Sequence, residues 1–443
     1  MQTTKAIKGF SKLDKEAKID WLVSTYLDGS ADAANQLKKY WIDDAQEQNT
    51  FDQFSENTLS NFHLPFGVAP NFLIDGKYYA VPMVIEESSV VAAASSAAKY
   101  WSQRGGIHTE IVDTQKIGQV HFTWSGDSAL LKSTFAQAKT HLENDTAEIT
   151  QNMRNRGGGI LDIELIDLTD QLDNLFQLKA TFETCDSMGA NFINTCLEQF
   201  ATALGCYYSD NHSQDGTLDV IMSILSNYTD HCVVKAWVEC PVSELKIAGD
   251  SVDHNEATEK FKTAVDIACI DPYRAVTHNK GIFNGIDAVV LATGNDFRAI
   301  EACGHAYASR SGQYASLSTC TIVDGVFRFE LEVPLAIGTV GGLTKLHPLA
   351  KMSLDILEQP TARELMSIIA ATGLAQNFAA VRSLTTTGIQ KGHMKMHLQN
   401  ILNQLEASDA ENKHVCDVLN GDHVSYSKVR QLIEEYRDEA GSG

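Results

Sequence analysis

The sequence predicts an α+β protein in which a small mixed domain is inserted into a larger, helix-rich one. Its 443 residues exceed one ordinary core, since a domain usually holds about 100–200 residues. Stretches with helical spacing of apolar residues alternate with short strand-like stretches, and their order changes near residue 116. An apolar fraction of 44% and a charged fraction of 21% are ordinary for a globular chain, which argues against wholesale disorder.

The charge balance narrows the classes of function. The chain has 35 basic and 57 acidic side chains and a formal net charge of −22 at pH 7. This surplus of negative charge argues against a nucleic-acid binder and against a protein held on anionic lipid, so neither partner is expected. A small anionic ligand is still compatible with the balance, because its site needs only a few local basic groups.

No export or membrane signal is visible in the sequence. The first twenty residues lack the apolar core of a signal peptide, and no stretch reaches the roughly 18–20 uncharged apolar residues of a spanning helix. Nine cysteines are scattered without a C-x-x-C pair, which gives little support to a zinc or disulfide framework. We therefore expect a cytoplasmic protein with reduced cysteines and no membrane attachment.

The N-terminal third predicts helices followed by a pair of strands. The expected elements are helices over 15–27 and 31–41 and strands over 71–74 and 78–85. The two strands meet across Asp75 and Gly76, which favour a tight turn. Ser89 precedes the small-residue run VVAAASSAA and predicts a helix N-cap there, which places Glu87 at a strand-to-helix junction.

The next part of the chain predicts the inserted small domain. Its expected elements are, in chain order, a strand over 120–124, a helix over 128–152, a glycine turn at 157–159, strands over 160–166 and 178–184, a helix over 189–204 and a strand over 218–225. The order strand-helix-strand-strand-helix-strand is that of the ferredoxin-like split motif.

The sequence after the small domain predicts mostly helices, of which residues 257–270 are the clearest. Basic side chains gather directly after this helix. Residues 271–285 contain Arg274, Lys280 and Asn284 and are interrupted by glycine, which predicts a loop that binds an anion. Arginine grips a carboxylate with its planar fork, and lysine adds a point charge. A solvated loop is an equally good interpretation of the same residues.

Asp296 stands between two predicted elements. A strand is expected over 290–293, ending at Gly294, and a helix over 297–308. A carboxylate at this point suits a functional site, but the N-cap of the helix is the better interpretation of the residue in isolation. The remaining expected elements are a hairpin over 320–333, a helical segment from about 383 and an amphipathic helix over 427–440.

Two local patterns raise the question of a cofactor or a metal. The G-x-G-x-x-G fingerprint of dinucleotide binding is absent. Residues 186–191, DSMGAN, stand between a predicted strand and helix, where free N–H groups and the helix dipole favour a pyrophosphate. A capped helix behind a tight turn is the favoured alternative for these residues alone. His393 and His397 lie four apart, but no third ligand is adjacent, so no metal is expected.

Taken together, the motifs resemble one family. They are, in order, PMVIEESSVVA at 82–92, DSMGAN at 186–191, HNKGIFNGID at 278–287, TGND at 293–296, GTVGG at 338–342 and GHM at 392–394. With them the chain resembles the class II, bacterial and archaeal type, 3-hydroxy-3-methylglutaryl-coenzyme A (HMG-CoA) reductases over nearly its whole length. Class I members carry a catalytic lysine just after the DSMGAN-type motif; here Lys280 fills the class II position instead.

The resemblance implies a four-electron reduction of HMG-CoA to mevalonate and free CoA, or its reverse, with two reduced nicotinamide cofactors. Glu87, Lys280, Asp296 and His393 match the family's catalytic four. Hydride attack builds negative charge on a carbonyl oxygen, which the Lys280 ammonium would stabilise while Asp296 orients it. Glu87 is expected to give a proton to that oxygen, and His393 to protonate the leaving CoA thiolate.

The resemblance also implies positions for the ligands. The substrate carboxylate maps onto Ser89, Arg274 and Asn284. The cofactor pyrophosphate maps onto Asp186, Ser187, Met188, Gly189, Ala190 and Asn191. Thr150 stands where an NADH-preferring member has an aspartate, and Arg154 and Arg156 follow as partners for a 2′-phosphate. NADPH is therefore the expected cofactor, with NADH as the alternative.

The family's architecture implies the division of the chain and its assembly. The expected parts are a large domain over 1–112 and 231–387, a small cofactor domain over 113–230 and a C-terminal flap over 388–443. Gly388 and Gly392 would permit the flap to hinge. The family builds its active site between two subunits, so we expect a homodimer with shared active sites, and a higher oligomer is left open.

Two other functions are kept as alternatives. One is a non-catalytic regulator that binds acyl-CoA or a nucleotide on the same scaffold, which four occupied catalytic positions disfavour. The other is a reductase of a different acyl-CoA, which Arg274 disfavours because it matches the residue that grips a free carboxylate.

Overall fold

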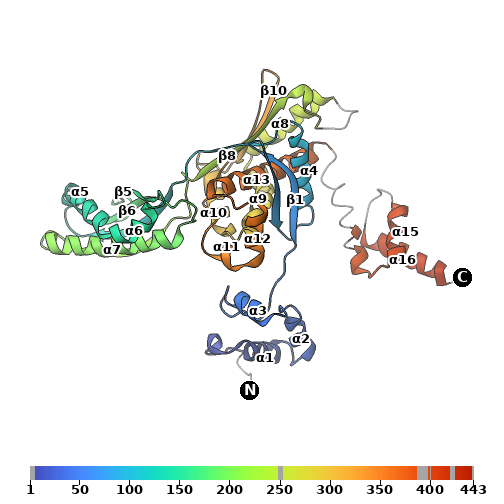
Figure 1. Cartoon of the computed structure of the whole chain (residues 1–443), viewed down its shortest axis with the longest axis horizontal. Coiled ribbons are helices and arrows are strands. Elements are labelled where there is room, and N and C mark those ends of the chain that lie inside the picture. Colours follow the sequence, from blue (N-terminus) through green and yellow to red (C-terminus); the bar gives the residue numbers. More distant parts are fainter. Residues whose placement is uncertain (1–4, 248–252, 387–397, 400, 420–424, 442–443) are drawn as a thin grey trace.

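The computed structural model describes residues 5–247, 253–386, 398–399, 401–419 and 425–441. Within these ranges, the chain forms two sheet-containing units and, at each of its ends, a small group of helices (Figure 1). We call the residues from β4 to β7 the small unit, and the hairpin β1–β2 with the other sheet and its helices the large unit. The cysteines are all unpaired thiols, as expected. The predicted α+β class is confirmed.

Three short helices open the chain. They are α1 (Lys15–Tyr26), α2 (Ala31–Lys38) and α3 (Ala45–Asp52), of which the third was not predicted. The Asp14 carboxylate accepts a hydrogen bond from the Ala17 N–H and so caps α1. The predicted helix over 31–41 ends three residues early, because Trp41 leaves the helix and its Nε1 donates to the Leu59 carbonyl at 2.9 Å.

The hairpin that leads to the site has the predicted turn. Strands β1 (Phe66–Ile74) and β2 (Lys77–Val84) pair antiparallel, and Asp75 and Gly76 adopt the positive φ that the turn requires. Helix α4 (Val90–Ser102) follows with Ser89 at its N-cap position. The predicted N-cap position is thus confirmed, but the Ser89 hydroxyl makes no capping hydrogen bond and is left for another partner.

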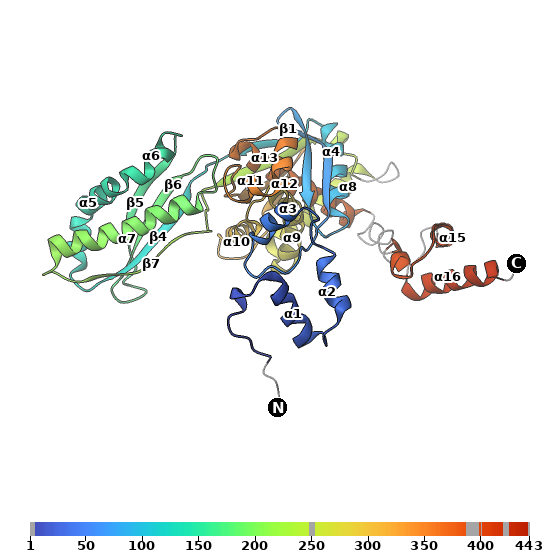
Figure 2. The ribbon, with the colours of Figure 1, turned by 60° about the horizontal axis from the view of Figure 1, so that its bottom comes forward.

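The small unit has the expected order of elements. They are β4 (Lys116–Trp124), α5 (Ser128–Asp145), α6 (Ala147–Arg154), β5 (Gly159–Asp167), β6 (Leu175–Glu183), α7 (Ala190–His212) and β7 (Leu218–Leu225). The strands form an antiparallel sheet in the order β5-β6-β4-β7, which is the ferredoxin-like arrangement. Helices α5 and α7 pack on one face of this sheet and share an apolar core with it (Figure 2).

One predicted helix of the small unit is divided. The helix expected over 128–152 breaks at Thr146, which has non-helical dihedral angles between α5 and α6. The buried Thr146 hydroxyl donates to the Leu142 carbonyl at 2.8 Å, a bond that competes with regular helix geometry.

The large unit is built on a second sheet, whose order is β3-β8-β10-β9. Its strands are β3 (His108–Ile111), β8 (Val233–Pro241), β9 (Ser318–Val323) and β10 (Val326–Pro334). The hairpin β9–β10 was predicted, whereas β3 and β8 were not. The part of the chain after the small unit, which was expected to be helix-rich, therefore begins with a strand. Helix α8 (His254–Ile270), helix α4 and helix α13 (Ala362–Thr385) complete its apolar core.

Helix α9 (Pro272–Ala292) corrects two predictions at once. The anion-binding loop expected over 271–285 forms the N-cap and the first part of this helix, and the strand expected over 290–293 forms its end and its C-cap. Asp271 caps it by accepting from the Tyr273 N–H, and Pro272 suits its first turn. Gly285 serves close packing and not a turn, because an added Cβ would lie 2.7 Å from the Thr372 carbonyl oxygen of α13.

The chain ends in helices. Helix α10 (Phe297–Ala308) has both predicted bounds, and α11 (Leu343–Leu346) and α12 (Pro348–Ile356) lead to α13. Helix α13 is long and apolar enough to cross a membrane, but 78% of its most apolar window is buried inside the protein, as in a core helix. Helices α15 (Asp409–Leu419) and α16 (Tyr426–Gly441), the latter predicted, pack on each other. Gly388, Gly392, His393 and His397 lie outside the described residues.

Candidate active site

The pair Glu87 and Lys280 forms the centre of the candidate site. Glu87 lies in the short segment between β2 and α4, and Lys280 lies in the first half of α9. Lys280 Nζ is 3.7 Å from Glu87 Oε2, with 62% and 32% of the two side chains exposed. An ion pair this exposed adds little to stability, about 0–1 kcal/mol at most. Both charged groups are therefore open to a ligand.

Asp296 has other partners in this conformation. Its carboxylate caps α10 by accepting from the Arg298 and Ala299 N–H groups at 3.1 and 3.2 Å. It also lies 3.2 Å from Arg298 Nε. The N-cap interpretation is thus confirmed. The expected contact with Lys280 is absent among the interactions of the described residues, and the ammonium pairs with Glu87 instead.

Three of the sequence motifs meet beside Asp296. The Asn295 amide oxygen accepts a hydrogen bond from the Gly338 N–H at 2.8 Å. At Gly338 an added Cβ would lie 2.5 Å from the Met188 backbone nitrogen, so only glycine fits there. The segment 338–342 therefore joins the loop that carries Asp296 to the turn at 186–191. The sequence alone assigned no role to Asn295 or Gly338, although they belong to the motifs TGND at 293–296 and GTVGG at 338–342.

The side chains of the turn at 186–191 hold its shape. The Asp186 carboxylate accepts from the Ala362 N–H, at the start of α13, at 2.8 Å. Ser187 Oγ donates to the Thr184 carbonyl at 3.0 Å, and the Thr184 hydroxyl donates to the Ser187 carbonyl at 2.7 Å. Gly189 has a φ of 91° and lies against the Thr184 side chain. Helix α7 follows without a side-chain cap, so its first N–H groups face no competing acceptor from a side chain.

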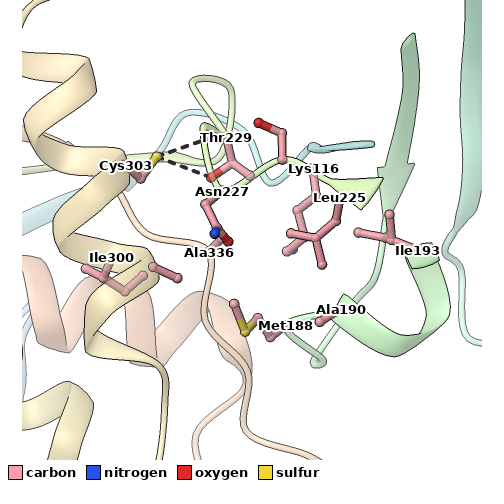
Figure 3. A pocket seen from close by; sticks show the side chains of 12 residues that line it. Lys116, Met188, Ala190, Ile193, Leu225, Asn227, Thr229, Ile300, Cys303 and Ala336 are labelled. Atoms are coloured by element: carbon pink, nitrogen blue, oxygen red, sulfur yellow. Dashed lines mark hydrogen bonds between the residues drawn. The ribbon is translucent and has the colours of Figure 1, made fainter. Parts of the chain in front are cut away.

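Two cavities lie on either side of this turn, between the two units. Figure 3 shows the first, a narrow apolar one in which Met188 and Ala190 face Ile300 and Cys303 of α10. The second is a wider cavity of about 290 Å³, whose wall includes Gly157, Cys185, Asp186 and Arg363. A cavity beside an uncapped helix start suits an elongated ligand with a phosphate group. Nothing in the sequence pattern marked Arg363 as part of this wall.

Lys116 contributes to both cavities and was not predicted as a site residue. It is only 3% exposed, and its ammonium donates to the Thr114 carbonyl at 3.2 Å. A lysine buried to this degree is uncommon, which is the signal that identifies it. The burial of Lys116 becomes visible only in the folded structure, because the sequence around it gives no sign that the side chain is enclosed.

The residues expected to recognise the adenosine end lie apart from one another. Thr150 is completely buried, and its hydroxyl donates to the Thr146 carbonyl at 2.9 Å, so it faces the helix and not a cavity. Arg154 and Arg156 are exposed at the end of α6. The Arg156 carbonyl accepts from the Cys185 thiol at 3.3 Å, which places it next to the wider cavity.

The three residues expected for the substrate carboxylate are not gathered by described contacts. Asn284 follows Lys280 by four residues and shares its face of α9. Arg274 precedes Lys280 by six residues and points to a different side of the helix. Its Nη2 lies 3.5 Å from His278 Nδ1, and partial burial lowers its pKa from the ordinary value.

The described residues contain no cluster of three His, Cys, Asp or Glu side chains that could hold a metal ion. The exposed pair of Lys280 and Glu87 can stabilise charge on a carbonyl oxygen, and the uncapped start of α7 beside its cavity can hold a phosphate group. Taken together, these two separate features suit an α+β oxidoreductase that uses a nucleotide cofactor.

Comparison with known proteins gives the family. The chain matches the family model described as hydroxymethylglutaryl-coenzyme A reductase over residues 22–398, and it belongs to this family. It is 35% identical over 433 residues to the 3-hydroxy-3-methylglutaryl-coenzyme A reductase of Archaeoglobus fulgidus, covering 97% of this chain and 94% of the relative. A probable reductase of the same name from Borreliella burgdorferi is 33% identical over 369 residues, covering 83% of this chain and 82% of that protein.

Solved structures agree with the class II resemblance. The class II reductase from Streptococcus pneumoniae, bound to NADPH in open conformations, has a TM-score of 0.69 and 36% identity, covering 86% of this chain and 99% of that chain. Another structure of the reductase from the same organism has a TM-score of 0.71 and 35% identity, covering 97% and 100%. The resemblance and the oxidoreductase class inferred from the sequence are both confirmed.

Proposed function

We propose that this protein reduces HMG-CoA to mevalonate and free CoA with two molecules of NADPH, or catalyses the reverse reaction. The observation that carries the proposal is the 3.7 Å pair of Lys280 and Glu87, open to ligand, in a chain of the HMG-CoA reductase family. Bound NADPH supplies a hydride in each of the two reduction steps. The residues of the chain stabilise charge, move protons and hold the ligands.

Lys280 is proposed to stabilise the negative charge that grows on the carbonyl oxygen. Its ammonium is held at one side by Glu87 and keeps donors free for that oxygen. Glu87 would first take up a proton from water, pass it to the oxygen of each reduced carbonyl, and return to the carboxylate that pairs with Lys280. Asp296 is proposed to orient Lys280, for which its carboxylate would have to exchange Arg298 for the ammonium, and His393 is proposed to protonate the CoA thiolate that leaves. His393 belongs to the proposed flap over 388–443.

The cofactor is proposed to lie along the turn at 186–191. The uncapped N–H groups of α7 suit the pyrophosphate, and the adjoining cavity has space for part of a dinucleotide. Arg154 and Arg156 are exposed beside that cavity and suit a 2′-phosphate, which favours NADPH over NADH. Thr150 acts only by not being acidic, because its own hydroxyl is buried.

Substrate carboxylate binding is proposed for Ser89, Arg274 and Asn284, shared between two subunits. Ser89 has a hydroxyl without a capping bond, and Asn284 lies on the Lys280 face of α9. Arg274 points elsewhere in its own chain, which supports a homodimer in which it serves the neighbouring site. We retain the proposed division into 1–112 with 231–387, 113–230 and 388–443. A cytoplasmic location is part of the same proposal.

Turnover tests this function directly. Purified protein with HMG-CoA and NADPH should consume two NADPH for each thioester, followed by the loss of nicotinamide absorbance in the near ultraviolet. Free thiol should appear once for each thioester. The absence of oxidation with both NADPH and NADH would refute the proposed activity, and a comparison of the two rates would establish the cofactor preference.

A further inference from the structure

A chain of buried polar side chains starts at Arg274. His278 lies one turn further along α9 and is 1% exposed. Arg274 Nη2 lies 3.5 Å from His278 Nδ1, and His278 Nε2 lies 2.6 Å from Ser318 Oγ, at the start of β9. Ser318 Oγ in turn donates to Asn377 Oδ1 of α13 at 2.8 Å. The chain thus connects Arg274 to the core of the large unit.

The chemistry of these groups fixes the direction of every bond. A guanidinium carries only donors, so His278 Nδ1 accepts and the imidazole hydrogen is on Nε2. Nε2–H then donates to Ser318, whose hydroxyl donates to Asn377. Burial, assisted by the charge of Arg274, lowers the pKa of His278 to about 3, so the imidazole is neutral across the physiological range. A single tautomer satisfies all three contacts.

We propose that His278 is a positioning residue that orients the Arg274 guanidinium for the free carboxylate of the HMG group. The inference rests on the proposed function, in which Arg274 binds that carboxylate. One N–H of the fork is directed at His278 Nδ1, which leaves the others for the ligand. Because the side chain is held before the ligand arrives, less rotational freedom is lost on binding.

The attachment of α9 to its neighbours does not depend on His278 alone. Asn279, the next residue, also attaches the helix from a fully buried position. Its amide donates to the Ala315 carbonyl at 2.9 Å and accepts from the Leu317 N–H at 3.0 Å. An apolar side chain would fill the place of His278 without the cost of burying a polar ring. The retained lone pair towards Arg274 therefore indicates a role for the ring beyond packing.

Substitutions that separate the two ring nitrogens test the proposal. His278→Gln reaches Ser318 but loses the acceptor at the Nδ1 position, whereas His278→Asn keeps an oxygen near that position. For His278→Gln we expect the KM for HMG-CoA to rise about 10-fold, with kcat and the KM for NADPH changed less than about 2-fold. For His278→Asn we expect a smaller rise in the KM for HMG-CoA.

A matched control separates positioning from packing. His305 of α10 is another partly buried histidine, with Nδ1 2.7 Å from the Tyr314 hydroxyl and its ring 4.9 Å from that of Phe283 in α9. His305→Gln should disturb the packing of α9 without changing the KM for HMG-CoA. In an Arg274→Ala background, His278→Gln should add less than about 2-fold to the KM, because the two residues act as a unit.

Several results would overturn the inference. They are a rise in the KM for HMG-CoA no larger than that of His305→Gln, an equal loss in kcat and both KM values, or full additivity with Arg274→Ala. These results require an active wild-type enzyme. If the wild type shows no turnover with either cofactor, the proposed function fails, and the inference fails with it.

Discussion

The Lys280 ammonium shows that a side chain can add little to the stability of the fold and still have a central role in the proposed reaction. It is 62% exposed and pairs with Glu87 at 3.7 Å, a contact with almost no effect on folding. Its proposed role is confined to the moment when charge grows on the carbonyl oxygen. Removal of the side chain should therefore affect the reaction and leave the fold intact.

The first prediction concerns Lys280→Ala. We expect kcat to fall by a factor on the order of 10²–10³, because one donor to the growing oxyanion is lost. The melting temperature should change by less than about 2 °C. Lys260→Ala is a matched control, since Lys260 is 59% exposed and pairs with Glu256 on α8, away from the site. Near-full turnover of Lys280→Ala would contradict the assigned role.

The second prediction concerns a partly buried acid on the same helix as Lys280. Asp287 of α9 has its pKa raised to about 8, mainly by burial and further by Glu301 of α10, and its Oδ1 has no hydrogen-bond partner. Between about pH 4 and pH 8 the folded protein therefore keeps a proton that the unfolded chain releases. Stability contributed by this group consequently falls as the pH rises through this range.

Asp287→Asn removes that penalty while keeping a donor for Glu301. We expect the variant to be more stable than the wild type by roughly 1–3 kcal/mol at pH 8 and nearly equal to it at pH 4. Chemical denaturation at the two pH values measures the difference. An equal gain at both values would show that packing, and not proton release, is the cause.

At the scale of the element, α9 carries the main lesson. Its two glycines have different surroundings. At Gly285 an added Cβ would lie 2.7 Å from the Thr372 carbonyl oxygen and 2.9 Å from Gln376 Cβ, whereas at Gly281 nothing lies within 4 Å. One glycine thus permits close packing of α9 on α13, and the other only lowers the helix propensity.

The third prediction compares these two glycines. Gly285→Ala should destabilise the protein by about 1–3 kcal/mol, because backbone atoms of α13 have to move. Gly281→Ala should stabilise it by about 0.5–1 kcal/mol, since it reduces the freedom of the unfolded chain at an uncrowded helical position. Urea denaturation of both variants provides the measurement. If both variants lost the same amount of stability, the contact with α13 would not be the reason.

The same helix shows why some of the fold could be predicted and some could not. The bounds of α10 and β7 follow from clear periodicity between turn signals, and both were obtained. In α9 the glycines and the polar cluster were interpreted as a loop, because the packing of α13 against Gly285 is not visible in the sequence. Strand β8 was missed because a short apolar run fits a helix equally well, and β3 was missed because its four residues, HTEI, carry no apolar pattern.

Part of the candidate site could also be predicted from the sequence. The motifs assigned Glu87 and Lys280 to one site, and the structure places their charged groups 3.7 Å apart. The orientation of Arg274 was not accessible, because a residue six positions from Lys280 has a defined direction only once the segment is known to be a helix. The ion pair of Asp296 with Arg298 also depends on the start of α10, where both residues lie within one turn.

At the scale of the whole molecule, the large and small units have separate apolar cores, and polar contacts between residues far apart in the sequence help to connect the units. Asp186 is one of them, since its carboxylate accepts from the first N–H of α13 at 2.8 Å. The turn that is proposed to hold the cofactor is thereby connected to the large unit, and its position depends on this bond.

The fourth prediction concerns that bond. Asp186→Ala should raise the KM for NADPH and speed amide exchange at Ala362 by a factor on the order of 10, because the acceptor is lost. Exchange in the core of the small unit should not change. Asp186→Asn retains an acceptor oxygen and should show a smaller effect. Unchanged exchange at Ala362 in the alanine variant would exclude Asp186 as the link.

The crowded position of Gly338 has a consequence for how the enzyme can diversify. Every side chain larger than hydrogen would collide with the Met188 backbone, so glycine at this position cannot be replaced without a shift of the backbone. Arg154 and Arg156 are exposed and tolerate exchange. If Arg154 and Arg156 hold the cofactor as proposed, exchanges at the exposed end of α6 could alter the preferred electron donor, while the close contact of Gly338 with Met188 that joins the two units stays the same.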